Sequence, residues 1–276
     1  MIKTNSKGVE RRIKKNIPNS IKKIVLFFVV NKISGMFVQK VFSRSMLGAR
    51  YNFSLVSPVI ASRIFFGLWE SAEIRFSKKY VNDGDIVIEL GSSIGVTLAT
   101  LCSTKKLKTY ISVEASSSSV QVLKSVVAEF SKCNIISINA AISYSTQTFV
   151  EFMETSFTES RLKNSIENND TPSAHESTNS KTYKVKSIQF NDIVDKHIPI
   201  DCEYVLISDI EGAEADIFGM DIESLSRCKL IICELEDTQK YSIDSQVNLL
   251  KLAGFSVKEY YGNVFIFEKS QKTNAK

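Results

Sequence analysis

The chain has 276 residues, of which 43% are hydrophobic and 24% are charged. This composition is ordinary for a soluble globular protein, and the length suffices for one large α/β domain with an appendage. The five cysteines include no C-x-x-C pair and are odd in number. They argue against a disulfide framework or a zinc site and favour buried thiols in a reducing cytoplasm.

The net charge of +5 is distributed unevenly along the chain. Residues 1–50 carry twelve Lys or Arg and one acid, whereas the remaining residues carry 23 bases and 29 acids. The later part has no spread of basic residues with interleaved aromatics, so we expect no nucleic-acid partner.

Residues 1–75 are predicted to form a basic, helical N-terminal extension. Its apolar run, residues 24–30, is cut by Asn31 and Lys32 and is too short for the roughly 20 apolar residues of a spanning helix. Two interpretations stay open. Residues 1–44 either contact the inner membrane surface through an interfacial helix with a polybasic flank, or contain a helix that packs on the main domain.

The segment 86–97 predicts a buried strand, a glycine turn and a helix. Four apolar residues lie within positions 86–90, and Gly91 and Gly95 precede a helical pattern at 96–102. Glycines let a backbone approach a ligand closely, and the N-terminus of the following helix favours an electron-rich group. We therefore expect Glu89, Gly91, Ser92 and Gly95 to line a nucleotide-like ligand. A βαβ unit whose glycines serve only tight packing is the alternative.

The next two predicted strands add to this site. The strand at 109–113 is followed by Glu114 and Ala115, and an acid at this position is placed to bind the two hydroxyls of a ribose. A helix is expected at 117–130. The third strand, 134–138, is followed by Ala140 at the edge where open α/β sheets bind ligands.

The rest of the chain continues the alternation of strands and helices. Strands are predicted at 149–153 and 183–188, around a polar insertion (155–181) that is a lid, a binding loop or a disordered segment. Further strands at 203–208 and 229–233, a helix at 244–253 and a hairpin at 255–267 complete the pattern. We predict an α/β fold with a doubly wound, mostly parallel seven-stranded sheet, in a domain spanning 76–270.

Several motifs together resemble one known family, the FkbM-type S-adenosylmethionine-dependent methyltransferases. They are, in chain order, GLWE, VIELGSSIG, SVEAS, NAAIS, SDIEGAEADIFG and IICELE. The resemblance implies the Rossmann-like class I methyltransferase fold and S-adenosylmethionine as cofactor. It also implies that Gly91 and Gly95 hold the methionine part, Glu114 the ribose, and the Ala140 region the adenine.

Two positions depart from the family pattern. The family commonly has a lysine where this chain has Ile207, and a proline where it has Ala115. The first departure lies two residues before Asp209, on the side where the acceptor is expected.

Acids at the ends of the last two parallel strands are the candidates for the chemical step. Methyl transfer to a hydroxyl requires an oriented acceptor that loses its proton, either to a carboxylate or with the help of a divalent metal. Asp209 and Glu234 are placed for either role, with Asp209 also bordering the cofactor. Glu211 is a further catalytic candidate, although Glu211 and Glu214 also suit the N-terminus of a helix.

The sequence therefore predicts O-methylation of a carbohydrate or small-molecule hydroxyl, such as a sugar of a bacterial surface glycan. Two alternatives come from other classes: a different nucleotide- or NAD-binding Rossmann enzyme, and a non-catalytic adapter that retains the fold. The enzyme is expected in the cytoplasm, with peripheral contact at the inner membrane surface as a further expectation.

Overall fold

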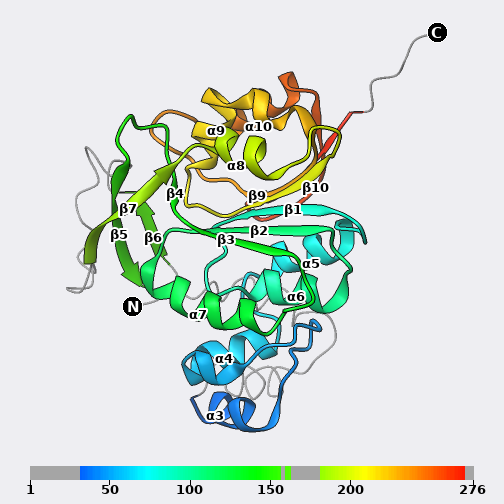
Figure 1. Ribbon diagram of the computed structural model, residues 1–276, viewed down its shortest axis with the longest axis vertical. Coiled ribbons are helices and arrows are strands. Elements are labelled where there is room, and N and C mark those ends of the chain that lie inside the picture. Colours follow the sequence, from blue (N-terminus) through cyan, green and yellow to red (C-terminus); the bar gives the residue numbers. More distant parts are fainter. Residues whose placement is uncertain (1–31, 157–158, 163–180, 271–276) are drawn as a thin grey trace.

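The computed structural model describes residues 32–156, 159–162 and 181–270, and they form a central sheet with helices on both faces (Figure 1). The strand order is β10-β11-β9-β8-β1-β2-β3. β11 runs antiparallel to both of its neighbours, whereas the pairs on the other side of β9 are parallel. The predicted seven-stranded, mostly parallel sheet with a C-terminal hairpin is confirmed.

The strands of the main sheet are β1 (Ile86–Leu90), β2 (Thr109–Glu114), β3 (Ile135–Asn139), β8 (Tyr204–Ser208), β9 (Cys228–Glu234), β10 (Phe255–Tyr261) and β11 (Val264–Lys269). The helices are α3 (Lys32–Val41), α4 (Pro58–Phe65), α5 (Ser71–Tyr80), α6 (Val96–Thr104), α7 (Ser117–Ala128), α8 (Phe190–His197), α9 (Glu214–Met220) and α10 (Ile243–Leu252), with short 3-10 turns η1 (Phe53–Leu55) and η3 (Ile222–Arg227).

The strands form where the chain is apolar on both faces. All five residues of β1 and of β8 are buried, because α5, α6 and α7 cover one face of the sheet and α8, α9 and α10 cover the other (Figure 1). Two separate apolar clusters result. Val87 and Ile207 belong to the cluster on the α5–α7 face, and Ile88 and Leu206 to the cluster on the opposite face.

A second, smaller sheet stands beside the ends of β2 and β3. It has the order β4-β7-β5-β6, from β4 (Ala141–Ile142), β5 (Phe149–Ser156), β6 (Glu159–Leu162) and β7 (Lys181–Ile188). The predicted pair at 149–153 and 183–188 is confirmed as the antiparallel pair β5 and β7. The predicted polar insertion, 155–181, contains the end of β5, all of β6 and the first residue of β7, while residues 163–180 lie outside the described part of the chain. Apolar alternation is missing around β6, so this strand could not be predicted from the pattern of residues.

The described part of the N-terminal extension shares the core of the sheet. Val38 on α3 and Phe53 in η1 belong to the same apolar cluster as Leu98 on α6, and α3 and α4 lie beyond α6 and α7 (Figure 1). The buried Tyr51 donates its hydroxyl to the carbonyl of Ile94, at 3.0 Å, within the glycine turn. The domain boundary that we placed at residue 75 lies inside α5, and the apolar run at 24–30 lies outside the described residues.

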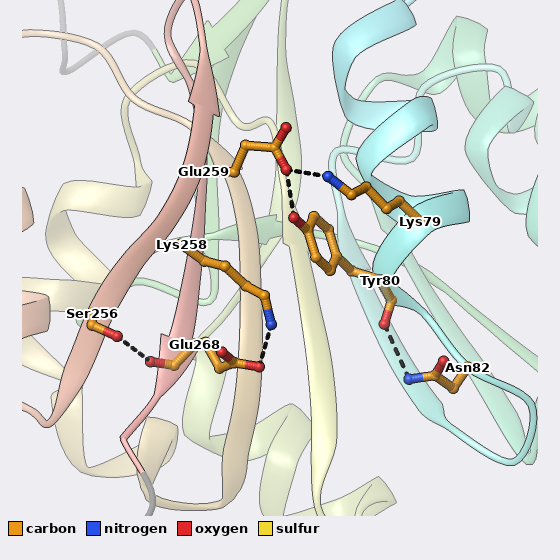
Figure 2. Close-up of polar contacts among 7 residues, drawn as sticks. All are labelled: Lys79, Tyr80, Asn82, Ser256, Lys258, Glu259 and Glu268. Carbon is orange, nitrogen blue, oxygen red and sulfur yellow. Dashed lines mark hydrogen bonds and ion pairs between the residues drawn. The ribbon is translucent and has the colours of Figure 1, made fainter.

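α5 is anchored at its C-terminal end to the hairpin of β10 and β11. Glu259 accepts hydrogen bonds from Lys79, at 2.5 Å, and from the hydroxyl of Tyr80, while Lys258 pairs with Glu268 beside them (Figure 2). These contacts hold one end of α5 at the edge of the sheet. Its other end reaches the glycine turn.

In the part of the chain that the structure describes, every helix falls short of the length and hydrophobicity needed to cross a bilayer.

Candidate functional site

The register of the parallel strands brings the predicted site residues to one edge. Leu90 is paired with both Val113 and Ser208, and Ser208 is paired with Cys233. The residues that follow these pairs therefore lie at the same level, with adjacent strands about 4.8 Å apart. They are Gly91, Glu114, Asp209 and Glu234.

The two glycines of the turn are required by backbone conformation and by packing. Both have a positive φ, 81° at Gly91 and 76° at Gly95. A Cβ on Gly91 would lie 2.0 Å from the carbonyl oxygen of Asp209, and a Cβ on Gly95 would lie 2.9 Å from Cδ1 of Leu123. Positive φ and close packing between protein segments are each sufficient to require both glycines. Their contact with a cofactor stays a prediction.

Glu114 is fixed at the end of β2 by the backbone around it. Its Oε2 accepts from the amide of Ser93 and its Oε1 from the amide of Ser116, both at 2.6 Å. Burial raises the pKa of Glu114, and these amide hydrogen bonds oppose the shift. Ala140 lies beside it, because the amide of Ala140 donates to the carbonyl of Glu114. The predicted ribose and adenine positions are therefore neighbours, and Ala115 lies next to them in the chain.

Glu89 is buried on the α5–α7 face of β1. Among the described residues, neither its Oε2 nor the hydroxyl of Tyr110 has a hydrogen-bond partner of good geometry, although the side chains of Ser92 and Tyr110 lie close enough to favour the charged form of Glu89. Burial raises the pKa of Glu89 to about 7. Its strand neighbour is Ile207, so the position where the family commonly has a lysine supplies no cation to this carboxylate. Ser92 is also buried and accepts from Ser112 Oγ at 2.8 Å.

Asp209 and Glu234 end neighbouring strands, as predicted. The pKa of Asp209 lies well above its usual range because of burial and then because of the charges of Glu234 and Glu70. Burial also raises the pKa of Glu234, with Glu236 adding to the shift. The charge of Glu234 thus acts on Asp209 across one strand spacing, and both carboxyl groups hold a proton more tightly than exposed ones do.

The loop after Asp209 is shaped by Glu214. Its carboxylate accepts from the amides of Ile210, at 2.7 Å, and Gly212, at 3.0 Å, and from Ser208 Oγ, at 3.0 Å. Glu214 therefore has the structural role at the start of the helix that its position suggested. Glu211 is partly exposed and has a positive φ of 55°, and its catalytic role stays a prediction.

Two acids at the start of α5 also act on this edge of the sheet, and neither was among the predicted site residues. Glu70 precedes this helix with a positive φ of 41°, and Glu73 lies in its first turn. Thr97 Oγ1 donates to Glu73 at 3.4 Å, while the charge of Glu70 acts on Asp209. Glu70 belongs to the GLWE motif, so the family resemblance pointed to it. Its position near Asp209 was not predictable, because Glu70 is far from the strands along the chain.

These acids form one group, which we call the acidic cluster. Its members are Glu70, Glu73, Glu89, Glu114, Asp209 and Glu234. In each of them burial is the main cause of a raised pKa, and within the described residues none forms an ion pair with a Lys or Arg. Over the same residues, no three His, Cys, Asp or Glu are arranged to hold a metal ion.

Comparison with known families identifies the domain that contains this edge. The model of the methyltransferase FkbM domain matches residues 84–257, which is more than half of the chain. The chain belongs to the FkbM methyltransferase family. The match begins just before β1 and includes β9, so the FkbM domain contains the glycine turn and the candidate bases. No curated protein matches the sequence.

Solved structures with a similar fold are distant in sequence. A protein of the NADB-Rossmann superfamily from Streptococcus agalactiae is 14% identical, with 72% of this chain and 68% of that chain covered and a TM-score of 0.41. The fibrillarin pre-rRNA processing protein of Methanococcus jannaschii is 13% identical (68% and 67% covered, TM-score 0.39). Fibrillarin of Aeropyrum pernix, with natively bound S-adenosyl-L-methionine, is 12% identical (68% and 67% covered, TM-score 0.39).

The residues of the FkbM domain fit the expected cofactor, S-adenosylmethionine. This cofactor carries a sulfonium and an ammonium group against one carboxylate, so it is a cation overall. The acidic cluster offers it negative charge, and the unpartnered Oε2 of Glu89 offers a buried acceptor. Family membership favours a methyltransferase over the alternative of an NAD enzyme.

Proposed function

We propose that this methyltransferase transfers the methyl group of S-adenosylmethionine to a hydroxyl oxygen of a carbohydrate or small molecule, with a sugar of a bacterial surface glycan as the acceptor. The observation that supports the proposal is the pairing of Asp209 and Glu234 at the ends of β8 and β9, beside the glycine turn. A carboxylate with a raised pKa at this position suits an acceptor that must lose a proton.

The chain's residues would act mainly by orientation and by proton transfer. S-adenosylmethionine, when bound, supplies an electrophilic methyl group. Asp209 accepts the proton of the acceptor hydroxyl, and its raised pKa makes it a stronger base than an exposed aspartate. Burial is the main cause of the raised pKa of Asp209, and the charge of Glu234 adds to it. Glu114 holds the ribose, which fixes the position of the reacting group relative to Asp209.

The cytoplasm is the proposed location. The described structure contains five free cysteines and is consistent with a reducing compartment. A glycan acceptor built on the inner side of the membrane would then be within reach.

The function is tested by following transfer of a labelled methyl group from S-adenosylmethionine to a panel of acceptors. The panel contains neutral glycan fragments, small hydroxyl compounds, amines and an RNA oligonucleotide. We expect label in an acid- and base-stable methyl ether of a hydroxyl compound. Labelling of RNA or of an amine would contradict the proposal, and cofactor binding without transfer to any acceptor would favour the non-catalytic adapter.

The base is tested separately with Asp209→Asn. Turnover should fall by about 100-fold or more, since general base catalysis contributes on that scale, while the cofactor dissociation constant stays unchanged. Asp195→Asn is the matched control, because it makes the same substitution at an exposed position on α8, outside the acidic cluster. Full turnover in Asp209→Asn would remove Asp209 from the role of base.

A further inference from the structure

The outer face of α3 is apolar and exposed. Ile33, Phe37 and Val41 are 70%, 58% and 56% exposed, and their spacing of four residues places them on one side of the helix. Met36 lies on the same side, and the exposed Phe42 continues the surface beyond the helix end. We call these five residues the α3 outer face. Isolated exposed apolar side chains are normal, whereas a contiguous set of this kind marks an interaction surface.

The opposite side of α3 is fixed to the domain. Val38 is buried, and a Cβ on Gly35 would lie 1.6 Å from the carbonyl oxygen of Pro58 at the start of α4. Ser34 and Ser62 hydroxyls also lie 3.1 Å apart across the two helices. Packing therefore determines which side of α3 faces outward. One side of this helix packs on α4, and the other side is exposed.

Positive charge surrounds this face. Lys32 and Lys40 are exposed on α3, and Arg44 follows it. The sequence before α3, residues 1–31, contains eight Lys or Arg and one acid, together with the apolar run at 24–30. Because residues 51–276 carry a net charge of −6, the basic region of the chain coincides with its exposed apolar helix.

We propose that the α3 outer face docks on the surface of an anionic lipid bilayer, with the apolar side chains in the interfacial layer and the flanking lysines on the lipid headgroups. Amphipathic helices with a basic flank bind membranes in this way, and both the apolar area and the positive charge contribute. A second copy of the chain is a less suitable occupant, since a symmetric contact would bring two segments of charge +11 together.

The proposal is tested on the full-length protein with sedimentable vesicles of phosphatidylcholine alone and of phosphatidylcholine mixed with phosphatidylglycerol. We expect binding to the anionic vesicles, little binding to the neutral ones, and a loss of binding as sodium chloride is raised. The double variant Ile33→Glu/Phe37→Glu should bind at least about tenfold more weakly, because it removes two inserted apolar groups and adds two like charges to the lipid.

The matched control is Ile200→Glu/Leu252→Glu, which changes two residues that are 83% and 86% exposed outside the α3 outer face. It should bind vesicles as the unchanged protein does. Urea unfolding should be the same for all three proteins, since the substituted side chains are exposed.

Three results would overturn the proposal. They are equal binding by both double variants, binding to neutral and anionic vesicles alike, and a dimer in light scattering that the Ile33→Glu/Phe37→Glu variant converts to a monomer. The last result would assign the face to a second copy. None of these readouts depends on methyl transfer, so the outcome is independent of the proposed function.

Discussion

Replacing Glu89 with glutamine tests whether burial beneath the glycine turn disfavours the charged form of this carboxyl group. Its pKa rises from 4.5 to about 7 through burial, and each pKa unit corresponds to about 1.4 kcal/mol. The shift therefore represents about 3 kcal/mol of stability, and little is lost to solvent screening because Glu89 is only 2% exposed. Glutamine keeps the shape of the side chain and removes the ionisation.

The sign follows from proton binding. The folded protein binds a proton at Glu89 more tightly than the unfolded chain does, so this group lowers the free energy of unfolding as pH rises from about 4.5 to about 7. The Glu89→Gln variant has no ionisable group at this position, so its free energy of unfolding does not fall for this reason as pH rises. The variant and the unchanged protein should have similar stability near pH 4.5, and the variant should be more stable by about 3 kcal/mol at pH 8.

The assay is urea unfolding of the cofactor-free protein at several pH values, with the slopes against urea compared at each pH. Glu259→Gln is the control, because hydrogen bonding to Lys79 lowers the pKa of Glu259 (Figure 2). Its contribution has the opposite sign: it is present above the unfolded pKa and is lost as pH falls. A stability difference for Glu89→Gln that does not change with pH would refute the reasoning.

Three further predictions concern the same edge of the sheet. Glu114→Ala should weaken S-adenosylmethionine binding in calorimetry by about 1.5–3 kcal/mol, the scale of a hydrogen bond to a charged group; an unchanged dissociation constant in a folded variant would remove it from the site. Gly91→Ala should lower the free energy of unfolding by more than about 2 kcal/mol, because the new Cβ would lie 2.0 Å from a backbone carbonyl oxygen. Gly84→Ala should lower it by about 1 kcal/mol, because Gly84 has a φ of 86° but open space around it. Equal losses in urea unfolding would contradict this prediction. Tyr51→Phe should cost about 1–2 kcal/mol by the same measurement, since a buried carbonyl loses its donor, and no loss would show that this hydrogen bond contributes nothing.

The main sheet was predictable because its strands are apolar on both faces. Runs such as 86–90 and 204–208 stand out from their surroundings, and the glycines and acids that follow them mark where each strand ends. Once the strands are parallel, their carboxyl ends meet at one edge. The proximity of Glu114, Asp209 and Glu234 therefore follows from the order of the strands without any knowledge of side-chain positions.

Features that depend on three-dimensional packing were not predictable. Strand β6 lies in a polar stretch that lacks apolar alternation, and its pairing with β5 determines its conformation. Glu70 and Glu73 join the acidic cluster because α5 crosses the face of the sheet, and the sequence alone does not specify that crossing. The function of the glycines was also ambiguous, since contact with a ligand and contact with a neighbouring strand both require the absence of a Cβ.

The hydrogen bond from Tyr51 to Ile94 joins the N-terminal extension to the glycine turn of the methyltransferase domain. Tyr51 follows α3 in the chain, and Ile94 lies between the two glycines of the turn. Through this bond and the packing around it, the N-terminal helices and the turn share one set of native contacts. Thermodynamic linkage is reciprocal: if a ligand at one end changes the affinity at the other, the second ligand changes the affinity for the first by the same factor. Tyr51 and Ile94 also belong to one apolar cluster, so the extension and the turn are parts of a single core.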